Sequence, residues 1–351
     1  MTLALLALAA ALVLALALQP GFTPGIGRRA HPAAVAALER VPVSETRQWV
    51  LMRGEDVANP VVLFVHGGPG TSQLTQNRRN PRALERHCTV VNWDQRLAGK
   101  SFAAGRDRSR LTVVQMVDDV VDLSTYLARH FHKDRILLVG HSWGSGIGLM
   151  AVARRPDLFL GYVGIGQVSR MSESERLSYD WTLEQARAAG DRAAVAKLGA
   201  IGPPPYTGPG WRAKFMTERR LLGKYGGEVH GSRVGAFGIV LGNVVWSPEY
   251  TMRDRVNVFR GIFRSVEALM PRMFELDLFA QVPEVRVPVW FCLGRHDWEV
   301  PAVLAARYFE ALRAPRKQLV WFERSAHLPN TEERDAFNRF LVETVLPAVR
   351  A

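Results

Sequence analysis

Four short apolar runs, each closed by Gly or polar residues, constrain the fold of this chain most strongly. They lie at residues 61–65, 89–93, 136–139 and 162–165. Runs of this length without polar alternation are typical of strands buried on both faces of a parallel sheet. Residues 46–53, followed by a Gly-Glu-Asp turn, predict an antiparallel strand that leads into the first of them. The sequence therefore predicts a mostly parallel central sheet.

A helix is predicted over residues 113–131, between the second and third apolar runs. Its apolar residues recur at three- and four-residue steps along one face, and Thr112 stands where an N-cap residue is expected. These apolar positions are Val113, Met116, Val117, Val120, Leu123 and Leu127. A strand, a helix and a further strand in succession indicate a crossover unit, so the expected fold class is α/β.

From about residue 167 to residue 274, the alternation of strands and helices gives way to Arg-, Ala- and Glu-rich helical stretches. Apolar runs typical of strands return at residues 287–293 and 318–322, before a terminal helix. Such an insertion between two parts of one sheet predicts a helical cap rather than an independent domain. The expected organisation is a hydrophobic N-terminal segment with a linker, the first part of the core, the cap, and the second part of the core. Their boundaries are 1–30, 31–166, 167–275 and 276–351.

Residues 140–144 read Gly-His-Ser-Trp-Gly and lie between the strand at 136–139 and an apolar stretch at 147–152. The Gly-x-Ser-x-Gly pattern in a strand, turn and helix context predicts a nucleophile elbow with Ser142 at its tip. The glycines leave room for the strand and the helix to approach each other at a strained turn. The N-terminus of the following helix favours negative charge beside the serine. We therefore expect Ser142 to be a nucleophile.

A serine hydroxyl needs a base to take its proton, and the base needs an acid to orient it. Asp297 and His327 each follow one of the last two predicted strands, in the chain order that an elbow serine uses. His296 competes with His327 as the base, and Glu299 competes with Asp297 as the acid. His327 is preferred because it lies in the loop after the last strand, whereas His296 shares the loop of the acid that it would face.

Residues 66–70 read His-Gly-Gly-Pro-Gly and directly follow the strand at 61–65. A Gly-rich turn in this place predicts the second part of an oxyanion hole. The backbone N–H groups of Gly68 and Trp143 are expected to bind the oxygen that gains charge in a tetrahedral intermediate.

No metal and no cofactor are predicted. His130 and His132 form an isolated pair without a carboxylate at ligand spacing. The Gly-rich stretch at 140–148 lacks the Lys-Ser/Thr ending of a phosphate-binding loop. Cys88 and Cys292 lie in apolar runs, which indicates two small buried side chains and no disulfide framework.

The formal net charge is +12, and the positive side chains are scattered along the chain. No zinc-finger spacing, aromatic-basic motif or basic helical arm accompanies them, so no nucleic-acid partner is expected. A scattered excess usually reflects solvated surface, and attraction to anionic lipid head groups is preferred over nucleic-acid binding. The sequence predicts no oligomeric state.

Residues 2–18 are Leu, Ala and Val after an opening Thr, and a Gly- and Pro-rich stretch follows them. This composition predicts an uncleaved membrane anchor, with membrane contact through residues 2–18 and a membrane-associated location. The alternative is a cleaved signal peptide and a secreted protein. Arg28 and Arg29 after the run would favour a cytoplasmic flank, and the side of the membrane stays open.

With these motifs assembled, the chain resembles the proline iminopeptidase-like group of the α/β-hydrolases over roughly residues 35–348. The resemblance rests on the motifs at 66–70 and 140–144 and on residues 92–96, Asn-Trp-Asp-Gln-Arg, with Gly-Lys-Ser at 99–101. It implies the α/β-hydrolase fold and a triad on Ser142, Asp297 and His327.

The resemblance also implies that Asp94 and Arg96 brace the loops around the site without taking part in catalysis. Leu97 stands where a Gly is usual in the family. Relatives that release N-terminal proline hold the substrate amine with lid carboxylates, one of them in a Trp-Glu pair. No such pair occurs in the insertion, and the only Trp-Glu pair of the sequence, Trp298-Glu299, lies in the loop of Asp297. The lid residues that could substitute are Glu173, Glu175 and Glu184.

The expected function is hydrolysis of a small ester or amide through an acyl-enzyme on Ser142. The alternative is a proline iminopeptidase acting on short peptides. A non-catalytic ligand-binding protein on the same fold is the third reading. Chemistry of the dehalogenase or epoxide-hydrolase type is disfavoured because those relatives carry Asp at the elbow.

Overall fold

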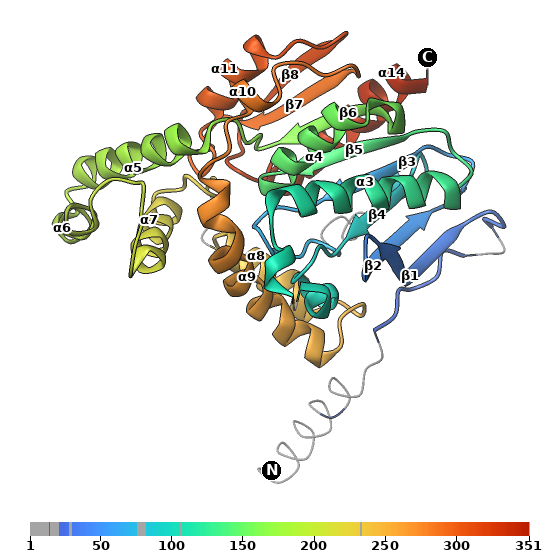
Figure 1. Cartoon of the computed structure of the whole chain (residues 1–351), viewed down its shortest axis with the longest axis horizontal. Helices are drawn as coiled ribbons and strands as arrows, with labels where there is room; N and C mark the ends of the chain where they lie inside the picture. The colour runs from blue at the N-terminus through green and yellow to red at the C-terminus, as the bar shows by residue number, and fades with distance from the viewer. Residues whose placement is uncertain are drawn as a thin grey trace.

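The computed structural model describes residues 14, 21–27, 30–75, 82–105, 107–231 and 234–350. Within them, eight strands form one sheet in the order β1-β2-β4-β3-β5-β6-β7-β8 (Figure 1). The strands are β1 Val35–Val43, β2 Thr46–Gly54, β3 Val61–Val65, β4 Thr89–Trp93, β5 Ile136–His141, β6 Phe159–Ile165, β7 Val289–Gly294 and β8 Lys317–Phe322. β1, β2 and β4 pair antiparallel, and all other neighbours pair parallel. The predicted mostly parallel sheet is confirmed.

The edge strand β1 is the one strand that the sequence did not predict. Its residues read VAALERVPV, and Ala, Glu and Pro are depleted in strands. β1 forms because a tight turn at Ser44, with φ 48°, folds it onto β2. The strand is therefore produced by pairing with its neighbour, which local composition does not reveal.

Helices cover both faces of the sheet, because successive strand residues point to opposite sides. Val61, Leu63 and Val65 pack under α3 Val113–His130, α4 Trp143–Arg154 and α11 Ala302–Ala311. Val62 and Phe64 pack on the other side. The covering elements there are α2 Arg82–Glu85, α13 Arg334–Phe340, the π-helical turn η5 Leu341–Val345 and α14 Leu346–Arg350. The helix predicted at 113–131 is confirmed, and Thr112 caps it by accepting a hydrogen bond from Gln115 N–H.

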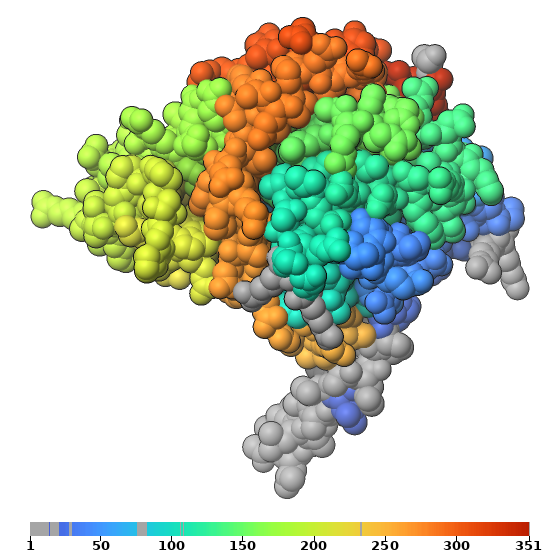
Figure 2. Space-filling view, viewed as in Figure 1, coloured from blue at the N-terminus to red at the C-terminus, as the bar shows by residue number. Residues whose placement is uncertain are grey.

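The predicted helical cap lies between β6 and β7. It consists of α5 Met171–Ala188, α6 Arg192–Ile201, α7 Trp211–Lys224, α8 Ala236–Val245 and α9 Met252–Met273. In Figure 2, α5 to α7 form a lobe that projects from the body, and the orange surface of α9 lies between this lobe and the core. Short elements connect the rest: η2 Gly99–Gly105, η3 Arg108–Arg110, η4 Pro156–Leu158, α10 Leu278–Gln281 and α12 Pro329–Glu332. The boundaries at 166/167 and 275/276 stay a prediction.

The prediction of a transmembrane helix and of a membrane-associated location is wrong. Apart from Leu14, residues 2–18 lie outside the described part of the chain. In the part that is described, no helix is both long and apolar enough to cross a membrane. A spanning helix needs about 20 predominantly apolar residues. The 22-residue α9 has the length, but charged side chains recur along it.

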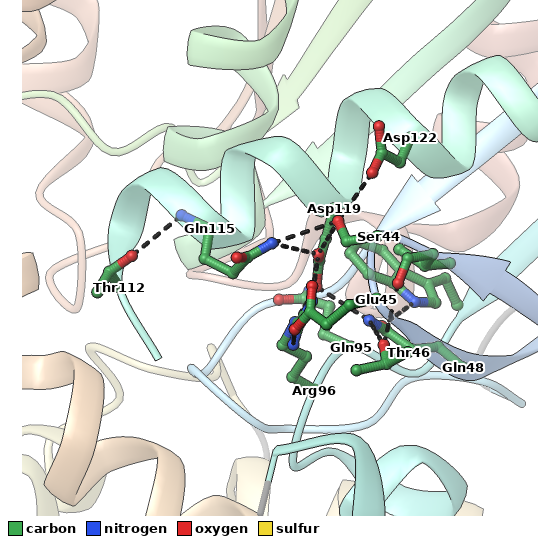
Figure 3. A network of polar contacts seen from close by, with 12 residues as sticks. Ser44, Glu45, Thr46, Gln48, Gln95, Arg96, Thr112, Gln115, Asp119 and Asp122 are labelled. Atoms are coloured by element: carbon green, nitrogen blue, oxygen red, sulfur yellow. Dashed lines mark hydrogen bonds and ion pairs between the residues drawn. The ribbon is translucent and has the colours of Figure 1, made fainter. Parts of the chain in front are cut away.

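A buried charge network joins the start of the sheet to α3 (Figure 3). Arg96, which is 2% exposed, binds Asp119 through two guanidinium nitrogens and Glu45 through two contacts of 2.6 and 3.1 Å. Asp119 also accepts hydrogen bonds from Ser44, Gln48 and Gln115. A buried ion pair is tolerated only when its remaining polar atoms are satisfied, as they are here.

Replacement of Asp119 by Ala should strongly destabilise the protein, because it leaves the Arg96 guanidinium buried without its main partner. Breaking a buried pair in this way typically costs about 3–5 kcal/mol. Urea unfolding of the full chain would measure the loss. Asp157→Ala removes the exposed pair with Arg155 and should leave the unfolding midpoint unchanged. Equal effects of both substitutions would contradict the structural role of the network.

Candidate active site

Ser142 occupies the sharp turn between β5 and α4. Its backbone has φ 54° and ψ −125°, a positive φ that residues other than Gly rarely adopt. The turn is tight because α4 starts directly against β3. A Cβ atom on Gly144 would lie 2.1 Å from the Val65 carbonyl oxygen, and one on Gly140 would lie 2.6 Å from the Gly144 carbonyl oxygen. The predicted strand, turn and helix context is present, and it holds Ser142 at the carboxyl edge of the parallel strands.

Asp297 and His327 lie together at the same edge of the sheet. His327 Nδ1 is 2.8 Å from Asp297 Oδ2, and Asp297 Oδ1 accepts a hydrogen bond from Val300 N–H at 2.9 Å. His327 is 3% exposed and Asp297 is 2% exposed. Because the carboxylate holds Nδ1, Nε2 is the ring nitrogen left for proton exchange. Ser142 and His327 line one common cavity.

The two competing residues take other positions. His296 stacks on His230, with ring centroids 3.7 Å apart and an interplanar angle of 7°. Glu299 Oε2 lies 4.0 Å from His327 Nε2, the nitrogen that does not face Asp297. The structure thus brings together the preferred acid and base, and their catalytic roles stay predictions.

The cavity beside Ser142 has a volume of about 90 Å³ and is lined by two acidic residues, Glu228 and Glu299. Ala236, Ile239 and Val240 of α8 form an apolar part of its wall. The sequence did not indicate Glu228, because this residue belongs to no motif and reaches the cavity from the loop after α7. It indicated Glu299 as a competing acid and as part of the Trp298-Glu299 pair in the loop of Asp297. Their joint position depends on how the cap folds over the sheet.

The three lid glutamates suggested as substitutes lie elsewhere. Glu173 pairs with Arg170 and Arg307, and Glu175 is buried against Arg219. Glu184 is exposed on α5. Of the described lid residues, Glu228 is therefore the one that brings a carboxylate into the cavity.

The segment after α7 forms backbone hydrogen bonds with the loops that follow β7 and β8. The Gly227 carbonyl accepts hydrogen bonds from Trp298 N–H at 3.0 Å and from Glu299 N–H at 3.2 Å. The Glu228 carbonyl accepts one from His327 N–H at 3.1 Å. A displacement of this segment would therefore move the loops of both Asp297 and His327.

The two N–H groups expected in an oxyanion hole belong to Gly68 and Trp143. Gly68 lines the cavity, and Trp143 is the first residue of α4, where an N–H has no acceptor within the helix. The Trp143 indole donates to Gln95 Oε1 at 3.1 Å, and Gln95 Nε2 donates to the His66 carbonyl at 2.7 Å. Gln95 thus holds the two Gly-containing turns in place.

Asp94 lies behind the cavity wall. It accepts hydrogen bonds from Lys100 N–H at 2.8 Å and from the Ser72 hydroxyl, which also contacts the Tyr250 hydroxyl near the start of α9. Leu97 has φ 64°, so its backbone has the conformation that favours the usual Gly. The bracing roles implied for Asp94 and Arg96 stay predictions.

Carboxylates dominate the electrostatics of the cavity. Burial lowers the pKa of His327, but the charges of Asp297 and Glu299 outweigh burial and raise the pKa to about 9. Burial and the charge of Glu299 raise the pKa of Glu228 to about 7. Burial lowers the pKa of His141 to about 3, so this neighbour of His327 is neutral. No set of three or more His, Cys, Asp or Glu side chains in the described ranges is arranged to hold a metal ion.

Known proteins are similar to this chain in sequence and in fold. Residues 60–200 match the model of a family described as alpha/beta hydrolase fold. The probable aminopeptidase YbaC of Bacillus subtilis is 32% identical over 87% of this chain and 94% of its own length. A proline iminopeptidase of Heyndrickxia coagulans is 23% identical over 79% of this chain and 87% of its own length.

Solved structures agree on the architecture. The proline iminopeptidase of Mycobacterium smegmatis has a TM-score of 0.63 at 18% identity and covers 90% of this chain and 99% of its own. VinJ has a TM-score of 0.63 at 20% identity and covers 89% of this chain and 99% of its own. The chain is a hydrolase that belongs to the α/β-hydrolase family, in its proline iminopeptidase-like group.

Proposed function

We propose that this hydrolase cleaves amide or ester bonds through an acyl-enzyme on Ser142. The observation that carries the proposal is the common cavity of Ser142 and His327, with His327 Nδ1 held 2.8 Å from Asp297. Ser142 Oγ attacks the carbonyl carbon while His327 Nε2 takes its proton. His327 then gives that proton to the leaving amine or alcohol.

The second half of the reaction uses the same groups. Water attacks the acyl-enzyme, His327 accepts its proton, and Ser142 leaves as the restored hydroxyl. In both halves the N–H groups of Gly68 and Trp143 stabilise the oxyanion. Each such donor typically contributes about 2.7–4 kcal/mol to the transition state.

The cavity favours substrates with a free amine over simple esters, which reverses the order expected from the sequence. Glu228 and Glu299 supply negative charge beside Ser142, and an ammonium group is the complementary partner. A volume of about 90 Å³ suits one small residue. The related protein of Bacillus subtilis is named a probable aminopeptidase, which supports the release of an N-terminal residue as the activity.

Reaction with a fluorophosphonate probe tests the nucleophile. The wild-type protein should be labelled on Ser142, and Ser142→Ala should abolish labelling, because the probe needs an activated serine. Ser172→Ala, which changes an exposed serine on α5, is the control, and it should still be labelled. Mass spectrometry would locate the adduct. A folded wild-type protein that stays unlabelled would contradict the proposal.

A pair of substrates tests the preference for an amine. Prolyl-naphthylamide should be cleaved about 10- to 100-fold more efficiently than its N-acetylated form, since acetylation removes a charge-assisted contact of about 1.5–3 kcal/mol. The ratio of kcat/KM measures the preference. Equal cleavage of the two compounds, or a strong preference for a short acyl ester, would sink the aminopeptidase assignment and leave the hydrolase chemistry standing.

Gly166 provides a test of how His327 is positioned. Gly166 has φ 52°, and a Cβ atom there would lie 2.7 Å from His327 Cε1. Gly166→Ala should therefore displace the imidazole and lower kcat/KM by about 100-fold. Gly190→Ala, at φ 64° with nothing within 4 Å of its Cβ, introduces the backbone strain alone and should retain activity. Similar losses in both variants would mean that strain, and not contact with His327, matters.

A further inference from the structure

His327 lies between two carboxylates, one on each ring nitrogen. Asp297 contacts Nδ1 at 2.8 Å, and Glu299 Oε2 lies 4.0 Å from Nε2. Nε2 is buried and accepts or donates no hydrogen bond within the part of the chain that is described. A second carboxylate on the Nε2 side is not needed to orient the ring, because Asp297 already does so.

Other charged groups around His327 reinforce this negative field. Glu228 lines the cavity from the cap, and its charge acts on His327 in the same direction as that of Glu299. His141, whose ring centroid is 4.9 Å away, is neutral. Glu332 of α12 accepts hydrogen bonds from the N–H groups of Ala326 and Leu328. Arg219, which binds Glu175, also interacts electrostatically with Glu299 and Glu228.

Two carboxylates on opposite sides of a buried imidazole favour its protonated form, and they raise the pKa of His327 to about 9. An imidazolium has no lone pair on Nε2 and cannot take the proton of Ser142. The carboxylates that surround the base therefore also reduce the fraction of His327 that is ready to accept a proton.

We propose that Glu299 is a specificity-determining residue that keeps His327 protonated until a substrate ammonium group enters the cavity and replaces the imidazolium as its cationic partner. This inference rests on the proposed function. One ammonium enters, and the Nε2 proton leaves His327 for solvent, so the net charge of the cavity is conserved. The neutral imidazole then accepts the Ser142 proton. Substrate recognition and activation of the base become one event.

A neutral ester brings no positive charge and leaves His327 protonated. Its cleavage then depends on removal of the proton by pH alone, so the rate rises with pH up to about pH 9. The preference for amines thus has two causes. One is direct contact of the ammonium group with Glu228 and Glu299, and the other is loss of the Nε2 proton from His327. If the carboxylates only bound the substrate, the second cause would be absent.

Glu299 also has a structural role in the backbone, and the test must separate the two. Its N–H donates to the Gly227 carbonyl at 3.2 Å, and its carbonyl accepts a hydrogen bond from the Ser178 hydroxyl at 3.4 Å. Glu299→Gln keeps both backbone contacts and the shape of the side chain while removing its charge. Glu184→Gln, on the exposed face of α5, is the matched control.

The experiment measures kcat and kcat/KM of the full-length protein from about pH 6 to about pH 10, on prolyl-naphthylamide and on a short neutral acyl ester. The profile of kcat/KM reports the free enzyme, and that of kcat reports the complex. For the wild type on the ester, the acid limb of both profiles, which is the pH range over which activity rises, should have its midpoint near pH 9. On prolyl-naphthylamide, the midpoint of the acid limb of kcat should lie at least one pH unit lower. This comparison tests the inference without any variant.

Glu299→Gln should change the rates of cleavage of the two substrates in opposite directions. The acid limb on the ester should fall by about one pH unit or more, so that ester cleavage near neutral pH rises by about tenfold. Cleavage of prolyl-naphthylamide should fall by about tenfold or more. Glu184→Gln should match the wild type on both.

If Glu299→Gln lowers the activity on both substrates equally and does not shift the acid limbs of the pH profiles, the inference is overturned and Glu299 is a structural residue. The inference is also overturned if the acid limbs for the two substrates coincide in the wild type. If the wild type cleaves neither substrate, or if Ser142→Ala retains full activity, the proposed function itself fails. These results differ, so the failure of one is not mistaken for the failure of the other.

Discussion

The close approach of α4 to β3 is the constraint on which the site depends. Gly144 lies so near the Val65 carbonyl oxygen that a Cβ atom would stand 2.1 Å from it. This contact forces the chain to turn within one residue, and Ser142 takes a positive φ of 54° as a result. A strained backbone persists only where the surrounding structure over-determines it. Here the buried parallel strands on either side of β5 supply that support.

The cap is joined to the catalytic loops through backbone atoms, so it is more than a cover. The Gly227 and Glu228 carbonyls accept hydrogen bonds from the loops that carry Asp297 and His327. The same segment brings the Glu228 carboxylate into the cavity. The groups that we propose to select the substrate and those that we propose to perform the chemistry are therefore parts of one connected unit. In this proposal, variation in the cap would alter both specificity and the position of the base.

Local features of the site were predictable, and long-range features were not. The elbow at 140–144 follows from a few adjacent residues whose conformation is set by sterics, so the sequence alone indicates it. The pairing of Asp297 with His327 follows from the topology of the parallel sheet. Glu228 could not be found in this way, because its place depends on how the cap folds over the sheet. β1 was missed for a different reason, since pairing with the adjacent β2 overrides its composition.

The overall charge of the chain misleads about its site. The chain carries a formal net charge of +12, which suggested an affinity for anionic lipid surfaces. The cavity has the opposite character, because Glu228 and Glu299 flank His327 and the nearby Arg219 is already bound by Glu175. In a buried site, a charge a few ångströms away outweighs scattered surface charges that water and salt screen. The cationic substrate that we propose would thus be selected by the local arrangement of carboxylates, in a protein whose scattered surface charge would on average repel it.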